Sequence, residues 1–92
     1  MAALSEEQID ERLRESTWER DGEEIAREWK FDDFAAAKAF VDRVAQAAEE
    51  TNHHPDILLH GWNRVRLSLV THSEGGLTDS DFEMAARFDG LA

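Results

Sequence analysis

The sequence predicts an α+β fold: a two-layer sandwich in which helices cover one face of a four-stranded antiparallel sheet. Two observations support this class. The expected elements follow the order helix, hairpin, helix, hairpin, helix, and no long loop or low-complexity tract interrupts them. The 92 residues fit one domain, which we expect to span residues 1–92. A chain this short buries only about 60–65% of its unfolded surface, so association between subunits would usefully supplement its small core.

The first helix is predicted to start after Ser5 and to end near Glu15. Ser5 and Gln8 form a capping-box pattern, in which each side chain bonds the other's backbone N–H. Residues 18–20 and 24–31 then flank Asp21-Gly22, a dipeptide typical of a tight hairpin turn. This part of the chain therefore predicts one helix followed by one hairpin.

A longer helix is predicted to start after Asp32 or Asp33 and to run to about Thr51. Pro55 prevents its continuation, because a proline holds its predecessor in extended geometry. The apolar residues of this segment recur at helical spacing: Phe34, Ala37, Phe40, Val41, Val44 and Ala48.

A second hairpin is predicted from residues 57–59 and 64–71, joined around Gly61-Trp62-Asn63. Apolar and polar residues alternate in its second strand, as in a half-buried strand. After the flexible Gly75-Gly76 turn, Thr78 can cap a last helix with Asp81 at its third position.

Composition excludes several classes of function. The formal charge of −11 repels phosphate backbones, so we expect no direct nucleic-acid binding. There is no cysteine, which excludes disulfides and thiolate chemistry. No apolar run approaches the ~20 residues that cross a bilayer, and the N-terminus lacks the pattern of a signal peptide. We therefore expect a cytoplasmic protein without a membrane segment.

Three of the four histidines lie at the boundaries of predicted elements. His53 and His54 lead into the second hairpin and His72 leaves it, so antiparallel pairing brings them to one sheet edge, and the next helix start brings Asp81 alongside. The unperturbed pKa of histidine is about 6.5, which suits proton transfer near neutral pH. With Asp81 and Glu49 to orient the rings, these residues would suit general acid–base catalysis.

Other interpretations of the same residues remain open at this point. His53 and His54 could simply end a helix, where a cation interacts well with the dipole. Asp81 has a sufficient structural role as a capping residue, and His72 could be an exposed strand-end residue. A zinc site built from the three histidines and Asp81 is conceivable, although adjacent histidines rarely chelate one ion comfortably. His60 fits none of these groupings and is expected at the surface.

The spacing of these residues resembles the signature of the pterin-4a-carbinolamine dehydratases. The signature runs over 33 residues, from an acid through His-His-Pro, an aromatic and a histidine to an aspartate. The resemblance covers residues 5–90, nearly the whole chain. The positions that carry it are Glu49, His53, His54, Pro55, Trp62, His72 and Asp81, flanked by Thr71, Gly76, Leu77 and Thr78.

The resemblance implies dehydration of 4a-hydroxytetrahydropterin to quinonoid dihydropterin, which recycles the cofactor of aromatic amino acid hydroxylases. It implies no metal and no bound cofactor. His53 and His72 would transfer protons, and His54 would bind the pterin or share that transfer. Glu49 and Asp81 would orient imidazoles, and Pro55 would fix the backbone that enters the strand. Trp62 is expected to pack rather than to contact the substrate ring.

The family also implies association, as dimers through sheet edges and in some members as tetramers through helices. We therefore expect a homodimer or homotetramer. A rival function is protein binding, because some family members serve as dimerisation cofactors of a transcription factor and inactive relatives act as assembly chaperones. The intact set of three histidines favours the enzyme, since a chain used only for binding has no reason to keep it.

Overall fold

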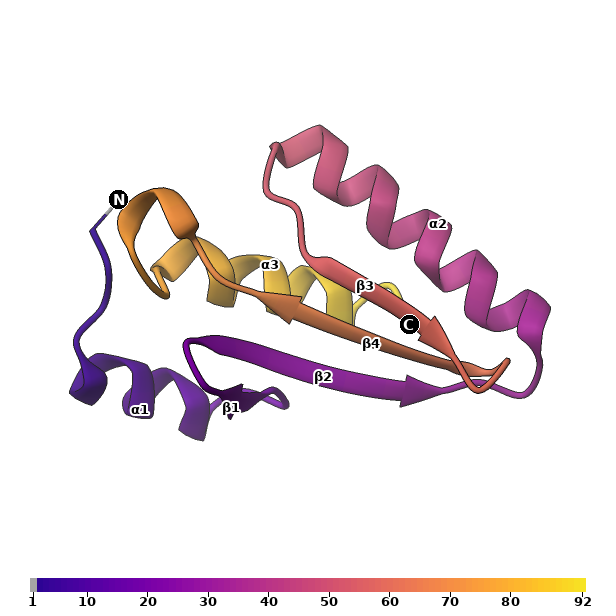
Figure 1. Ribbon diagram of the computed structural model, residues 1–92, viewed down its shortest axis with the longest axis horizontal. Coiled ribbons are helices and arrows are strands. Elements are labelled where there is room, and N and C mark those ends of the chain that lie inside the picture. The colour runs from indigo at the N-terminus through magenta and orange to yellow at the C-terminus, as the bar shows by residue number, and fades with distance from the viewer. Residues whose placement is uncertain (1) are drawn as a thin grey trace.

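The elements of the chain follow the predicted order (Figure 1). The structure is a computed structural model and describes residues 2–92. Its elements are α1 (Glu6–Arg14), β1 (Glu19–Asp21), β2 (Glu24–Lys30), α2 (Phe34–Thr51), β3 (Asp56–His60), β4 (Arg64–Leu69), the 3-10 turn η1 (His72–Glu74) and α3 (Asp79–Asp89).

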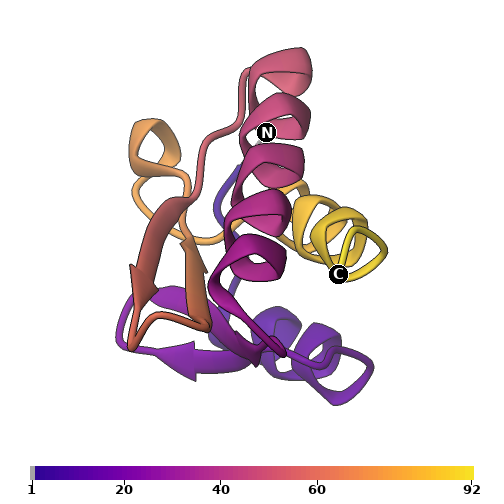
Figure 2. The ribbon, with the colours of Figure 1, turned by 90° about the vertical axis from the view of Figure 1, so that its right-hand side faces the viewer.

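The four strands form one sheet in the order β1-β2-β4-β3, and every neighbouring pair is antiparallel. Helices α2 and α3 lie on the same side of this sheet, while the opposite face of β3 and β4 carries no helix (Figure 2). The predicted α+β class is confirmed. β1 and β3 are the edge strands, and the start of β3 lies beside the end of β4 (Figure 1).

The core lies between the sheet and the helices. In β4 the residues at alternate positions, Val65, Leu67 and Leu69, are buried, as the period of two for a strand requires. Phe40 of α2 is fully buried, with ring centroids 4.9 Å from Trp29 of β2 and 5.2 Å from Phe31, which directly follows β2. These contacts fix α2 across the strands, and the end of α2 in turn positions His53.

Sequence signals at the helix starts are confirmed. Ser5 accepts from the Gln8 backbone N–H and donates its own N–H to the Gln8 side chain, at 3.1 and 2.9 Å. Asp33, rather than Asp32, caps α2 by accepting from the Ala36 N–H at 2.7 Å. α2 ends at Thr51, where Asn52 adopts a left-handed conformation with φ of 53°.

The first hairpin differs by one residue from the prediction. The turn consists of Gly22 and Glu23, because Asp21 still pairs with Glu24 in the ladder. Gly22 has φ of 62° at the first central position, where a two-residue hairpin turn favours glycine. The Asp-Gly dipeptide thus marked the correct turn, but its aspartate belongs to the strand.

In the second hairpin, β3 is longer than the predicted 57–59 and β4 is shorter than the predicted 64–71. β4 ends at Leu69, and Thr71 makes an isolated bridge with Gly76 that closes the loop around η1. This closed loop brings Thr71 back toward the start of α3.

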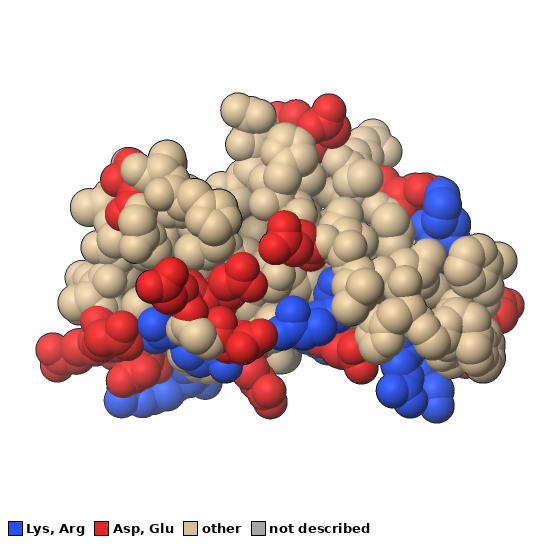
Figure 3. Space-filling model, in the orientation of Figure 1, with Lys and Arg blue, Asp and Glu red and all other residues tan. Residues whose placement is uncertain are grey.

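The acidic surface is interleaved with basic side chains (Figure 3). Arg20 forms an ion pair with Glu6 through two hydrogen bonds. These bonds hold the pKa of the Glu6 carboxyl below its usual value. Arg66 pairs with Asp21 across the sheet. No helix within residues 2–92 combines the length and the apolar character needed to cross a membrane.

Candidate active site

His53 and Asp81 come from two distant segments and meet beside the sheet. His53 follows α2, and Asp81 lies in the first turn of α3. The Nε2 atom of His53 is 2.7 Å from Oδ1 of Asp81. Asp81 is fully buried, whereas the His53 side chain retains 17% exposure. A protected carboxylate thus holds an imidazole that solvent and small molecules still reach.

The second oxygen of Asp81 is bonded as well. Its Oδ2 accepts from the Thr71 hydroxyl at 2.8 Å and from the Thr78 backbone N–H at 2.9 Å. The hydroxyls of Thr71 and Thr78 lie 3.0 Å apart. Asp81 therefore caps α3, as the capping-box pattern predicts, and also binds His53. Asp81 can therefore be both the helix-capping residue and the partner of His53.

A second imidazole–carboxylate pair lies next to the first. His54 Nε2 is hydrogen-bonded to Oε2 of Glu49, which lies in the last turn of α2. Both side chains are more than half exposed. The two adjacent histidines thus differ in environment, because only His53 is held by a buried acid.

His72 and Pro55 lie at the same end of the second hairpin. His72 is exposed at the start of η1 and directly follows Thr71, the donor to Asp81. Pro55 lies between His54 and the first residue of β3, so it fixes the line along which the chain enters the edge strand. Chain topology therefore brings His53, His54, His72 and their two acids to one region, as predicted.

Trp62 lies elsewhere. It is in the loop between β3 and β4, at the opposite end of the hairpin from the three histidines. Its side chain is 63% exposed, so the expectation that it packs within the chain is wrong. The physical reason is the turn geometry: Gly61 and Trp62 both have positive φ, of 55° and 60°, which directs the chain around the tip. His60, expected to be a surface residue, is partly exposed and bonds Oε1 of Glu28 at 2.6 Å.

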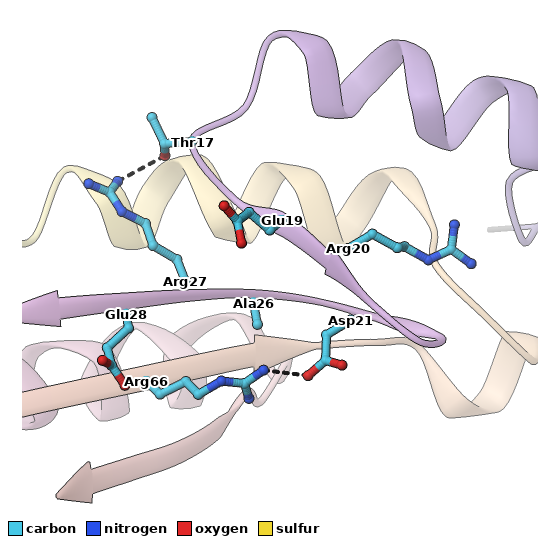
Figure 4. A pocket seen from close by; sticks show the side chains of 8 residues that line it. All are labelled: Thr17, Glu19, Arg20, Asp21, Ala26, Arg27, Glu28 and Arg66. Carbon is cyan, nitrogen blue, oxygen red and sulfur yellow. Dashed lines mark hydrogen bonds and ion pairs between the residues drawn. The ribbon is translucent and has the colours of Figure 1, made fainter.

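A hollow of about 470 Å³ lies apart from the histidines, over β1, β2 and β4 (Figure 4). Its guanidinium groups are already engaged: Arg66 bonds Asp21, and Arg27 bonds Thr17 and Asp89. No histidine lines it.

No group of three or more histidine, aspartate or glutamate side chains within residues 2–92 is arranged to hold a metal ion. His53, His54 and His60 are each paired with one carboxylate. Because a carboxylate accepts hydrogen bonds, Nε2 of His53 donates to Asp81, and the other ring nitrogen, Nδ1, is left to accept or release a proton. Such a group can serve as a general acid or base.

Sequence reasoning missed the donor role of Thr71. The available signal was a threonine just beyond a predicted strand, followed by the Thr78–Asp81 capping pattern. What the sequence lacked was the Thr71–Gly76 bridge, which turns the loop back so that the Thr71 hydroxyl reaches Asp81.

Comparison with known proteins agrees with this geometry. The sequence model of the family described as pterin 4 alpha carbinolamine dehydratase matches residues 2–91. A relative from Acidobacterium capsulatum is 50% identical over 99% of both chains, and one from Nocardia farcinica is 49% identical over 97% of this chain and 94% of its own. Both carry the name "Putative pterin-4-alpha-carbinolamine dehydratase".

Two solved structures share the fold. A transcriptional coactivator/pterin dehydratase from Brucella melitensis is 38% identical over 98% of both chains, with a TM-score of 0.90. A pterin dehydratase-like protein described as a RuBisCO assembly factor of the alpha-carboxysome is 28% identical, with a TM-score of 0.67, over 84% of this chain and 88% of its own. Fold and site define a small α+β protein with carboxylate-paired histidines. The chain belongs to the pterin-4a-carbinolamine dehydratase family, and this membership supports a dehydratase activity.

Proposed function

We propose that the protein dehydrates 4a-hydroxytetrahydropterin to quinonoid dihydropterin by histidine acid–base catalysis. The observation that carries the proposal is the bond between His53 and the buried Asp81, within a chain that belongs to the family. In the reaction a base removes the N5 proton, the freed electron pair forms the C4a=N5 double bond, and an acid protonates the departing 4a-hydroxyl. Water leaves, and no electrons are exchanged with another molecule.

His53 and His72 are proposed to transfer the two protons. His53 has one ring nitrogen held by Asp81, so the Nδ1 side of the ring faces the reaction. His72 follows Thr71 and is exposed at the same end of the hairpin. Proton transfer by a positioned side chain contributes about 10²–10⁴-fold to a rate. Asp81 is proposed as a positioning residue, because it acts through His53.

His54 is proposed to bind the pterin ring or to share in proton transfer. Its bond to Glu49 fixes the imidazole plane while leaving much of the ring exposed to a ligand. The physiological consequence we propose is recycling of the tetrahydropterin cofactor of aromatic amino acid hydroxylases.

We also propose that the protein is a homodimer joined through a sheet edge. β1 and β3 each leave one row of backbone groups unpaired in the single chain, and such rows are templates for pairing with another strand. Pairing would supplement the modest core of a 92-residue chain.

The function is tested by following the decay of synthetic 4a-hydroxytetrahydropterin with and without the protein. We expect wild type to accelerate the decay over the buffer rate, and to do so equally after exhaustive chelation with no zinc detected by elemental analysis. A rate equal to buffer would refute the enzymatic proposal and favour a non-enzymatic role, such as the coactivator and assembly-factor roles named for the two solved relatives. Activity lost on chelation would refute metal-free catalysis.

A further inference from the structure

The two edges of the sheet differ in their ability to accept another strand. β1 consists of Glu19, Arg20 and Asp21, which are all charged and exposed. A short, charged edge resists further pairing. Between its terminal residues β3 is entirely apolar, and Ile57 and Leu58 are 37% and 53% exposed. β3 is therefore the edge suited to a second copy of the chain.

Two-fold symmetry restricts how β3 can pair with its own copy. In an antiparallel pair related by a two-fold axis, the residue on the axis faces itself, and residues equally far from it along the two chains face each other. An axis at Leu58 pairs the whole of β3 and places Asp56 opposite the partner's His60. An axis at Ile57 or Leu59 pairs only residues 56–58 or 58–60. The register centred on Leu58 pairs all five residues of β3, so it is favoured over the two registers that pair three.

The same register also aligns residues that lie outside β3. His54 lies four positions before Leu58 and Trp62 four positions after it, so the pairing sets each Trp62 level with the partner's His54. A residue before proline is biased toward extended geometry, which favours continuing the strand direction back to His54. At the other end, Asn63 is fixed by its bonds to the backbone of Phe31, at 2.8 and 2.9 Å. The tip that carries Trp62 is thereby held in place.

Trp62 combines two features that are unusual for a large aromatic side chain. A positive φ is uncommon for a bulky residue, and here the turn at Gly61 and Trp62 imposes it. The indole is also 63% exposed. We infer that in the homodimer Trp62 of each subunit covers His54 of the other, so that every active site is completed by an aromatic side chain in trans. This inference rests on the proposed edge dimer, and its catalytic consequence rests on the proposed function.

The chemistry of the site agrees with this placement. The His54 side chain is 52% exposed in the single chain, and a flat heteroaromatic substrate beside it needs an apolar surface to pack against. An indole supplies a large, rigid apolar face at little cost in conformational entropy. The partner subunit's Trp62 would supply that face.

Cross-linking tests the placement without reference to activity. The chain has no cysteine, so introduced thiols are the only ones present. Directly opposed residues have Cα atoms about 4.5–5.5 Å apart, within the range of a disulfide. We expect Leu58→Cys to cross-link with its own copy, and an equal co-refolded mixture of His54→Cys and Trp62→Cys to give a cross-linked heterodimer on a non-reducing gel.

Two controls make this result decisive. His54→Cys alone and Trp62→Cys alone should stay uncross-linked, because two copies of either position are about 26 Å apart at 3.3 Å per residue. If Leu58→Cys cross-links but the mixture does not, Trp62 does not reach the partner's His54 and the inference fails. If neither Leu58→Cys nor the mixture cross-links, β3 is not the pairing edge and the inference fails as well.

Complementation between variants tests the catalytic consequence. His54→Ala and Trp62→Gly should each lose activity; glycine is chosen because it adopts positive φ without strain. In a heterodimer of the two, one site holds His54 from one subunit and Trp62 from the other, so a co-refolded equal mixture should regain roughly a quarter of the wild-type sites. No recovery, or full activity of Trp62→Gly alone, would overturn completion in trans. An inactive wild type would refute the proposed function but leave the cross-linking result standing.

Discussion

The Nε2 atom of His53 lies 2.7 Å from Oδ1 of Asp81, a carboxylate with no solvent exposure. The same carboxylate caps α3 through its bond to the Thr78 N–H. One side chain thus fixes both the start of a helix and the orientation of an imidazole. The stability of α3 and the activity of the site should therefore respond together to changes at this position.

Asp81→Asn is expected to lower activity and stability at once. The amide keeps the shape of the carboxylate but removes its charge and one acceptor, so one of the donors around it loses its partner. An unsatisfied buried group costs about 1–3 kcal/mol, which urea unfolding would detect. Misorientation of His53 should reduce kcat about 10-fold or more, within the range attributed to acid–base catalysis.

Asp89→Asn is the matched control for this prediction. Asp89 is the last residue of the same helix, and its carboxylate accepts from Trp18 and Arg27 at 2.8 and 2.7 Å, far from the histidines along α3. It should lose stability but retain kcat. Equal effects of the two substitutions on kcat would show that Asp81 matters only for folding.

Thr71→Val should reduce activity less than Asp81→Asn does. The substitution preserves shape but removes the hydroxyl that donates to Asp81 at 2.8 Å. We expect a loss of about 1 kcal/mol in the free energy of unfolding, and a reduction of kcat by a few-fold. Thr17→Val is a close control, because the Thr17 hydroxyl donates to Asp89 at the same distance. A kcat unchanged by Thr71→Val would show that the Thr71 hydroxyl does not help Asp81 to position His53.

The ion pair of Glu6 and Arg20 predicts a pH dependence of stability. Hydrogen bonding to Arg20 holds the pKa of Glu6 below its ordinary value of 4.5. A carboxyl whose pKa is lowered by folding stabilises the native state fully above its unfolded pKa, and this contribution is lost as pH falls through the folded pKa. The stability difference between wild type and Glu6→Gln should therefore be constant near neutral pH and shrink in acid below about pH 4.5.

Urea unfolding at several pH values would measure this difference. Glu7→Gln provides the comparison, because it removes the same charge from the same helical turn and no ion pair of Glu7 itself is found within residues 2–92. Because the pair of Glu6 is on the surface, added salt should reduce the difference. A Glu6→Gln difference that persists unchanged into acid would contradict the assignment.

The sequence was sufficient to predict elements whose signals are local. The capping pattern at Ser5 and the helical spacing in residues 34–51 gave two helices with nearly correct limits, because a cap and an amphipathic stripe are set by neighbours along the chain. The hairpin at Gly22 was placed one residue too early, since the dipeptide signal does not reveal which residue still pairs.

The site was predictable only as far as topology allows. Antiparallel pairing was enough to bring His53 and His72 to one end of a hairpin, and family spacing supplied the substrate. The contact of Thr71 with Asp81 depends on a loop bridge with no local sequence signal. The position of Trp62 was misjudged because burial was assumed from residue type, whereas turn geometry places it at an exposed tip.

The most direct test of histidine acid–base catalysis is the rate of 4a-hydroxytetrahydropterin dehydration by His53→Ala beside wild type, with both proteins shown to be folded by circular dichroism. We predict that wild type exceeds the buffer rate and that the variant loses about 10²–10⁴-fold of kcat. Equal rates for a folded His53→Ala and for wild type would contradict the account.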